Sequence, residues 1–133
     1  MKRVLVVEDM LSRIDWFKQH LIGCKVDFAH TVVDSLRLLR ENDYDTIFLD
    51  HDLNDEHYTC LFEGKELTTE LLEQSGTEVA RWLGANPDKS SQARVILHSL
   101  NEEGRKRMAS HLKGRRVDDV PFTVLPKRLR IIQ

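Results

Sequence analysis

The sequence predicts an α/β protein whose mostly parallel sheet is covered by helices on both faces. Short apolar runs of strand length alternate with segments whose apolar residues recur at helical spacing. This alternation extends along the chain without internal repeats or low-complexity linkers. Several of the apolar runs also stop abruptly at acidic or polar residues, as buried strands do at the edge of a sheet. Repeated strand–helix units of this kind favour a parallel sheet.

Five strands are predicted. Their residues are continuous apolar runs, which is typical of strands buried on both faces of a parallel sheet. The predicted strands are Lys2–Val7, Lys25–Ala29, Tyr44–Asp50, Arg94–His98 and Val120–Leu125, the last bordered by Pro121 and Pro126.

Helices are predicted between the strands. The spacing of apolar residues predicts one over Met10–Leu21, with Gly23 as its stop. Thr31 and Asp34 have the spacing of a capped helix start, and that helix is predicted to end at Asn42.

Two further helices follow the same rules. Ser75 with Glu78 forms a candidate capping box for a helix that closes at Asn86-Pro87, and Asn101 caps a short helix before the fifth strand. An insertion at about residues 54–75 separates the third strand from its helix, where a few residues would suffice. A lid and a plain surface insertion both fit this segment.

Composition places the chain among ordinary globular proteins. Its 133 residues form one predicted domain, 1–133, and 41% hydrophobic with 32% charged residues exclude a disordered chain. The absence of an 18-residue apolar run excludes a membrane span, and four apolar residues after Met1-Lys2-Arg3 are too few for a signal peptide. We therefore expect a cytoplasmic protein. Cys24 and Cys60 lack metal or redox spacing and are expected to be reduced thiols.

Charge is distributed unevenly along the chain. Residues 1–100 hold 11 Lys and Arg against 18 Asp and Glu, whereas residues 101–133 hold nine against four. A basic end beside an acidic pocket would steer a phosphorylated ligand. Solvated helix and tail positions explain the same pattern.

Three predicted strands end in residues that carry chemistry. Because parallel strands present their carboxyl ends at one edge of a sheet, these side chains are expected to form one acidic, histidine-bearing pocket for a metal and a phosphate. The residues are Glu8-Asp9 after the first strand, Asp50-His51-Asp52 after the third, and His98-Ser99 after the fourth.

The chain resembles receiver domains of the response-regulator superfamily over nearly its whole length. Receiver domains carry an acidic pair after strand one, a phosphoacceptor Asp after strand three, Ser or Thr after strand four and Lys after strand five. The resemblance implies a flavodoxin-like, doubly wound sheet of order 2-1-3-4-5 with its site at the switch point. The matching residues are Glu8-Asp9, Asp50, Ser99 and Lys127.

Three departures from receivers are visible. His51 follows Asp50 where receivers usually have an apolar residue, and Pro126 precedes Lys127 where receivers usually have Lys followed by Pro. Only residues 127–133 are left for the last helix, which is expected to be short or missing.

A narrower resemblance is to the cyclic-phosphate-processing receiver family. That family is defined by an LDHDL-type strand end and an HSxN signature followed by Gly and Met, and it is inferred to act on cyclic phosphate ends. The matching residues are Asp50-His51-Asp52-Leu53, Ser75–Ala80, His98-Ser99-Leu100-Asn101, Gly104 and Met108.

A divalent cation would relieve the repulsion between the converging carboxylates, which raises their pKa values. Oxygen ligands suit Mg²⁺, whereas a histidine ligand would shift the preference toward Mn²⁺. The candidate ligands are Glu8, Asp9, Asp50 and Asp52. Placement at a helix N-terminus explains Glu8-Asp9 as well, and a turn cap explains Asp52.

His51 and His98 separate the possible functions, because imidazole transfers protons at neutral pH and phosphotransfer to Asp needs no histidine. Asp50, His51 and His98 are therefore the candidate catalytic residues, with Asp50 acting either as metal ligand or as nucleophile. Ser99 and Asn101 either bind phosphate or cap the next helix. Arg105 or Lys127 would offset the charge that develops on the phosphate.

Three functions remain open. The first is a metal-dependent phosphoesterase that acts on 2′,3′-cyclic phosphate RNA ends or cyclic nucleotides. The second is a stand-alone phosphoacceptor receiver that signals through Asp50, and the third is an inactive receiver-like binding module. The expected partner is a phosphorylated small molecule or an RNA end, not duplex DNA or a membrane. The sequence leaves the oligomeric state open.

Overall fold

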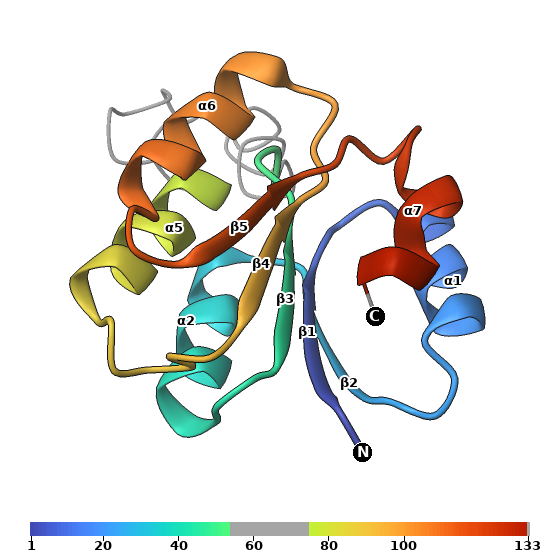
Figure 1. Ribbon diagram of the computed structural model, residues 1–133, viewed down its shortest axis with the longest axis horizontal. Coiled ribbons are helices and arrows are strands. Elements are labelled where there is room, and N and C mark those ends of the chain that lie inside the picture. Colours follow the sequence, from blue (N-terminus) through green and yellow to red (C-terminus); the bar gives the residue numbers. More distant parts are fainter. Residues whose placement is uncertain (54–74, 133) are drawn as a thin grey trace, which may run out of the picture.

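A computed structural model of the chain describes residues 1–53 and 75–132. Apart from Ser75, the predicted insertion lies outside the described residues. The fold is one five-stranded parallel sheet of order β2-β1-β3-β4-β5 (Figure 1), which confirms the predicted fold class and strand order. The strands are β1 (Arg3–Val7), β2 (Lys25–Ala29), β3 (Thr46–Leu49), β4 (Arg94–Leu97) and β5 (Arg116–Asp119).

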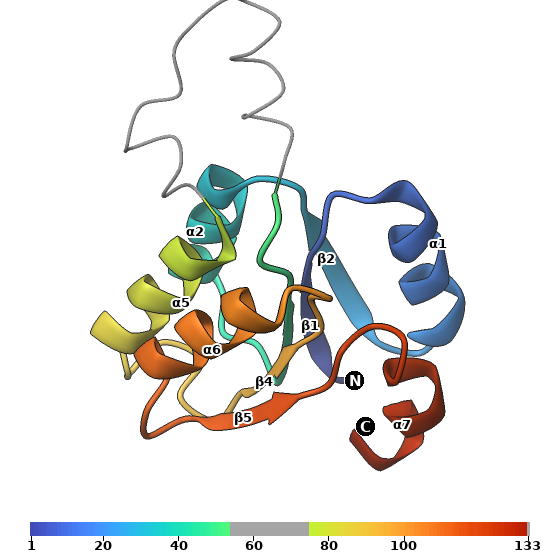
Figure 2. The same ribbon diagram turned by 90° about the horizontal axis from the view of Figure 1, so that it is seen from above.

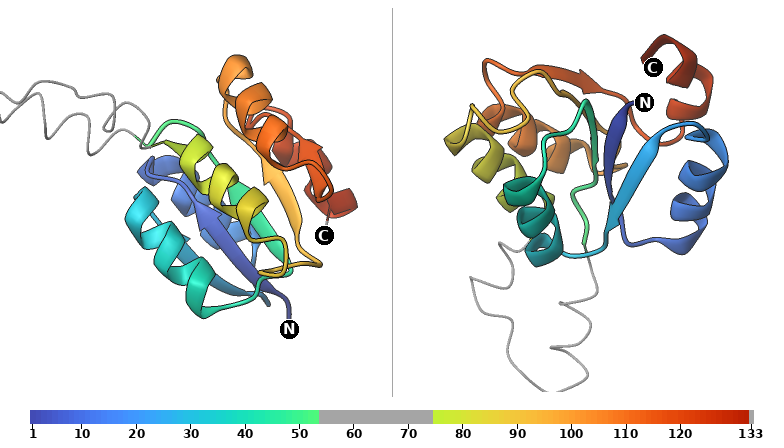
Figure 3. Two further views of the ribbon diagram at one scale, coloured as in Figure 1. Left: turned by 90° about the vertical axis from the view of Figure 1, so that its left-hand side faces the viewer. Right: turned by 90° about the horizontal axis from the view of Figure 1, so that it is seen from below.

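Helices cover both faces of the sheet. Helices α1 and α7 lie on one face and α2, α5 and α6 on the other (Figure 2), and the latter three lie side by side (Figure 3, left). None of the helices in the described ranges is long and apolar enough to cross a membrane. The helices are α1 (Leu11–His20), α2 (Val32–Glu41), α5 (Gly76–Ala85), α6 (Glu102–His111) and α7 (Leu125–Ile132).

The alternation of side chains along the strands divides the core into two clusters. In β1, Leu5 and Val7 pack under α2, α5 and α6, whereas Val4 and Val6 pack under α1 and α7. All residues of β3 are buried, so its continuous apolar run fills both clusters.

The predicted helix caps are present. Thr31 Oγ1 accepts from the backbone N–H of Asp34 at 3.1 Å. Ser75 Oγ caps α5 by accepting from the N–H of Thr77 at 3.2 Å. The predicted capping box joined Ser75 with Glu78, one residue further along the helix. Asn101 caps α6 in the same way. These bonds satisfy backbone donors that a helix start leaves free.

The predicted fifth strand over Val120–Leu125 is wrong. The fifth strand is Arg116–Asp119, which lies at one edge of the sheet, pairs with β4 alone and exposes both of its end residues. Pro121 begins a turn in which its carbonyl accepts from the N–H groups of Val124 and Leu125. Val120 and Leu125 are buried, so their apolarity reflects core packing rather than a strand. The last helix, α7, has eight residues and is short, as expected.

Candidate active site

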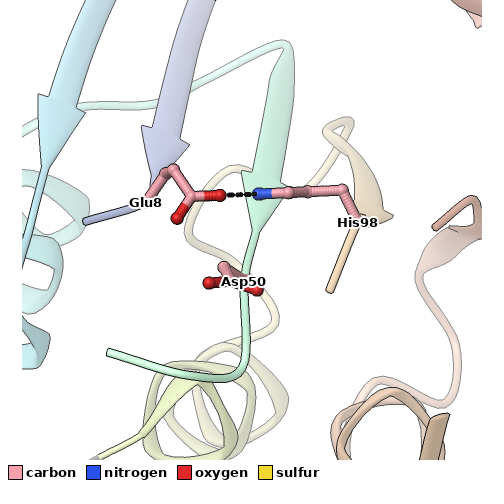
Figure 4. A group of neighbouring side chains, drawn as sticks. All are labelled: Glu8, Asp50 and His98. Carbon is pink, nitrogen blue, oxygen red and sulfur yellow. Dashed lines mark hydrogen bonds and ion pairs between the residues drawn. The ribbon is translucent and has the colours of Figure 1, made fainter. Parts of the chain in front are cut away.

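The register of the sheet brings three strand ends together. Val7 pairs with Leu49, and Leu49 pairs with Leu97. The next residues along these strands are Glu8, Asp50 and His98, and one ligand atom from each lies within 4.8 Å of the others. We call these three residues the edge cluster. Figure 4 shows their side chains converging at the ends of β1, β3 and β4.

Glu8 and His98 form a buried pair. His98 Nε2 lies 3.0 Å from Glu8 Oε1, and both side chains are fully buried. Burial lowers the pKa of His98, so it is neutral at pH 7 and donates from Nε2 to the carboxylate. Burial on its own would raise the pKa of Glu8, but the hydrogen bonds from His98 and from the N–H of Met10, with the nearby charge of Arg13, bring it below its usual value.

Asp50 is the carboxyl of the edge cluster that keeps an oxygen without a hydrogen bond. It is only 3% exposed, and its Oδ1 has no hydrogen-bond partner among the described residues. Burial, followed by the charge of Glu8, raises the pKa of Asp50 to about 8. The side chain is therefore a carboxyl group that holds its proton at neutral pH unless a cation takes the place of that proton.

Arg13, on α1, supplies a cation that sequence reasoning missed. Its Nη1 lies 3.4 Å from Glu8 Oε1 and 4.0 Å from Asp50 Oδ1. Its guanidinium also lies over the Phe122 ring, 5.1 Å from the ring centre. A weak signal was present, because Arg13 follows Glu8 by five residues and lies on the first turn of the predicted helix. Only the packing of α1 decides that it faces the edge cluster.

His51 lies beside the edge cluster but turns toward α6. Its Nδ1 lies 2.8 Å from Asp52 Oδ1, and its ring is seated against Gly104. A Cβ atom on Gly104 would come within 2.5 Å of this ring, so the glycine makes room for His51. The backbone N–H of Gly76 donates to the carbonyl of His51 at 2.8 Å, which ties this loop to the start of α5.

The predicted phosphate-binding residues lie around the start of α6, except for Lys127. Ser99 is buried and its Oγ accepts from the N–H of Asn101, while Asn101 Oδ1 accepts from Gly104. Arg105 donates to the Ser99 carbonyl at 2.7 Å and pairs with Asp119. These bonds give Ser99 and Asn101 capping roles, which leaves their phosphate binding a prediction.

The other candidates are more loosely placed. Lys127 lies exposed in the first turn of α7, without an ion pair to any described residue. Asp9 is half-buried and is not a member of the edge cluster. Asp52 faces His51 rather than Asp50. The roles predicted for these three residues stay predictions.

A divalent cation fits the donors of the edge cluster. Two buried atoms, Asp50 Oδ1 and His98 Nδ1, have no hydrogen-bond partner among the described residues. A carboxyl with a raised pKa beside a second carboxylate is stabilised when a cation replaces its proton. Two carboxylates with one imidazole suit Mg²⁺ or Mn²⁺.

A family model for the cyclic-phosphate processing receiver domain matches residues 5–114. The chain belongs to this family. The match includes every residue of the edge cluster together with His51, Asn101 and Gly104, and it confirms the narrower resemblance drawn from the two motifs. Among curated proteins, no sequence matches this receiver.

Solved structures of receiver domains share the fold. The response regulator TrrA from Thermotoga maritima, in complex with Mg(2+)-BeF, is 23% identical, with a TM-score of 0.62 and complete coverage of both chains. A CheY-like receiver domain from Methylobacillus flagellatus is 19% identical, with a TM-score of 0.62 and coverage of 100% and 99%. The receiver domain of a histidine kinase from Syntrophus aciditrophicus is 17% identical, with a TM-score of 0.64 and coverage of 99% and 89%.

Proposed function

We propose that this receiver is a metal-dependent phosphoesterase that acts on cyclic phosphates, namely 2′,3′-cyclic RNA ends or cyclic nucleotides. One observation carries the proposal. Asp50, a buried carboxyl with an unsatisfied oxygen, is followed directly by His51, whose ring is oriented by Asp52. Membership of the cyclic-phosphate processing family supports the substrate class.

Glu8 and Asp50 would hold the divalent cation, with Asp9 and Asp52 as further predicted ligands. Mg²⁺ suits the carboxylates, and Mn²⁺ becomes favoured if His98 contributes its free Nδ1. When bound, the cation supplies charge neutralisation at the phosphate. Arg13, next to both carboxylates, adds a second positive charge for the phosphate oxygens.

His51 is the proposed proton carrier. Its Nδ1 faces Asp52, which leaves Nε2 for the reacting groups. In the hydrolysis, the oxygen of a water molecule bonds to phosphorus and the bond between phosphorus and one ribose oxygen breaks. His51 takes the proton of the water and returns one to the ribose oxygen. His98 is fully buried and bonded to Glu8, so its proposed role is to position that carboxylate.

The test is turnover of defined substrates. The purified protein is incubated with Mg²⁺ or Mn²⁺ and a panel of 2′,3′-cyclic nucleotides and RNA oligonucleotides with cyclic-phosphate ends. Asp50→Asn and His51→Gln are each expected to lower turnover by about 100-fold or more. Asp15→Asn and His20→Gln, exposed on α1, are the matched controls. Absence of turnover with both metals, or full activity of His51→Gln, would contradict the proposal.

A second candidate is signalling through phosphorylation of Asp50. The fold shared with response regulators and the position of Asp50 directly after β3 favour it. A small phosphoryl donor would then label Asp50 with an acid-labile phosphate, and His51→Gln would leave the labelling unchanged. Labelling without turnover of any cyclic phosphate would favour this function over the phosphoesterase.

A further inference from the structure

A polar cavity lies between α5 and α6, beside the edge cluster. Its volume is about 270 Å³. We call it the α5–α6 groove. It is lined by residues from the cap and the middle of α5, from the second half of α6 and from the loop after β3: His51, Ser75, Thr77, Glu78, Arg81, Arg107, Ser110 and His111.

The lining of the groove suits an anion. None of the lining residues is an aliphatic or aromatic hydrocarbon side chain, and three carry hydroxyl groups. Thr77 Oγ1 is buried without a hydrogen-bond partner in the described part of the chain. The single carboxylate, Glu78, is already paired with Arg81. Arg107 is exposed and has no ion-pair partner among the described residues, so its guanidinium is available to a ligand.

The groove shares His51 with the proposed reaction site. His51 lines the groove, while Asp50, the preceding residue, belongs to the edge cluster. A ligand whose reacting phosphate lies at Asp50 would therefore reach the groove past His51. Pockets for whole drug-sized ligands begin at about 300 Å³, so this cavity suits one unit of a larger ligand rather than the whole of it.

We propose that the α5–α6 groove binds the phosphodiester next to the reacting end of an RNA strand, with Arg107 as its main contact. Guanidinium groups pair with two phosphate oxygens at once, and the unpartnered hydroxyl of Thr77 adds a hydrogen bond. This inference rests on the proposed function and narrows its substrate class. The substrate is an RNA strand with a cyclic end, and a cyclic mononucleotide lacks the group that the groove holds.

Arg107→Gln tests the groove, and Arg40→Gln is the matched control. Arg40 is an exposed arginine on α2, and its substitution removes the same charge. Binding and turnover are measured with Mg²⁺ for a short RNA that ends in a 2′,3′-cyclic phosphate and for a 2′,3′-cyclic mononucleotide. Arg107→Gln is expected to weaken RNA binding and raise the KM for RNA about tenfold, with kcat unchanged. The slope of log K for RNA binding against log salt concentration should become shallower by about 0.7. This is the change expected when one phosphate contact on a single strand is lost.

The outcomes separate the groove from the chemistry. Equal affinity for RNA and mononucleotide, or equal effects of Arg107→Gln and Arg40→Gln on RNA binding, would contradict RNA binding by the groove. If the mononucleotide is still hydrolysed, the proposed phosphoesterase activity is unaffected by that result. RNA binding that depends on Arg107 without turnover of either substrate would support the groove and overturn the phosphoesterase.

Discussion

Glu8 Oε1 and His98 Nε2 are joined by a 3.0 Å hydrogen bond that is completely shielded from solvent. The two residues follow β1 and β4, which are separated in the sheet by β3. Glu8 Oε2 also accepts from the N–H groups of Asp9 and Met10, at 3.0 and 3.1 Å. These bonds hold a charged carboxylate in the interior beside Asp50, whose proton is retained partly because Glu8 is charged.

His98→Leu is expected to destabilise the protein by about 3 kcal/mol, because it leaves the buried charge of Glu8 without its neutral donor. The measurement is urea unfolding with the midpoint and slope determined together. His20→Leu, at an exposed position on α1, is the control and should change the free energy of unfolding by less than about 0.5 kcal/mol. A His98→Leu effect no larger than that of the control would show that the pair contributes nothing to stability.

Asp50→Asn is expected to stabilise the metal-free protein at alkaline pH. The pKa of Asp50 is raised to about 8 in the folded protein, so its contribution to stability is present below pH 4 and is lost as pH rises through 8. The variant cannot ionise, so its stability relative to the wild type should rise by about 4 kcal/mol between pH 5 and pH 9. Thermal unfolding of both proteins between pH 5 and 9, in the presence of a chelator, measures this difference. A constant difference across that range would refute the raised pKa.

Binding of Mg²⁺ is expected to depend steeply on pH. The cation must displace the proton of Asp50, so with a pKa of about 8 the affinity at pH 6 should be about 100-fold weaker than its limit at high pH. Titration calorimetry at pH 6, 7, 8 and 9 gives the affinities and the proton release. Asp50→Asn should abolish the dependence, whereas Asp15→Asn should retain it. Equal affinity at pH 6 and 9 would exclude Asp50 as the ligand.

Gly104→Ala is expected to impair turnover without unfolding the protein. The new methyl group would meet the His51 ring at 2.5 Å, so the ring must move away from its bond with Asp52. Such a displacement costs about 100-fold in rate, while the helix propensity of alanine, worth about 1 kcal/mol, offsets part of the cost of overpacking, so the protein stays folded. Turnover and thermal unfolding are compared with Glu103→Ala, an exposed change on the same helix. Unimpaired turnover would show that the position of His51 is immaterial.

Arg115→Lys is expected to destabilise the protein by about 2–4 kcal/mol, because a lysine replaces a guanidinium that binds several carbonyls at the end of α5 and in the following loop. Arg116→Lys, on the exposed neighbour, is the control and should be near neutral. Denaturant unfolding measures both, and equal stabilities would contradict the assignment. The guanidinium donates to the carbonyls of Leu83, Asn86, Lys89 and Ser90 at 2.7–3.3 Å.

The sequence alone determined the central strands, the helix starts and the fold class. β1, β3 and β4 lie in the interior of the sheet, so they appear as apolar runs that local pattern detects. The edge strand Arg116–Asp119 escaped prediction because it contains a single apolar residue, Val117, whereas the other edge strand, Lys25–Ala29, contains three. The buried residues Val120 and Leu125 suggested a strand instead, although Pro121 turns the chain toward α7.

The sequence also determined that acids and imidazoles would gather at one edge, because each follows directly on a strand. Only the tertiary structure decided how they pair. Register aligns Glu8 with His98 across β3, and helix packing turns His51 toward Gly104 and brings Arg13 to the carboxylates. The physical reason is that periodicity and capping act over a few neighbouring residues. Side-chain pairing depends on register and packing between segments as many as 90 residues apart.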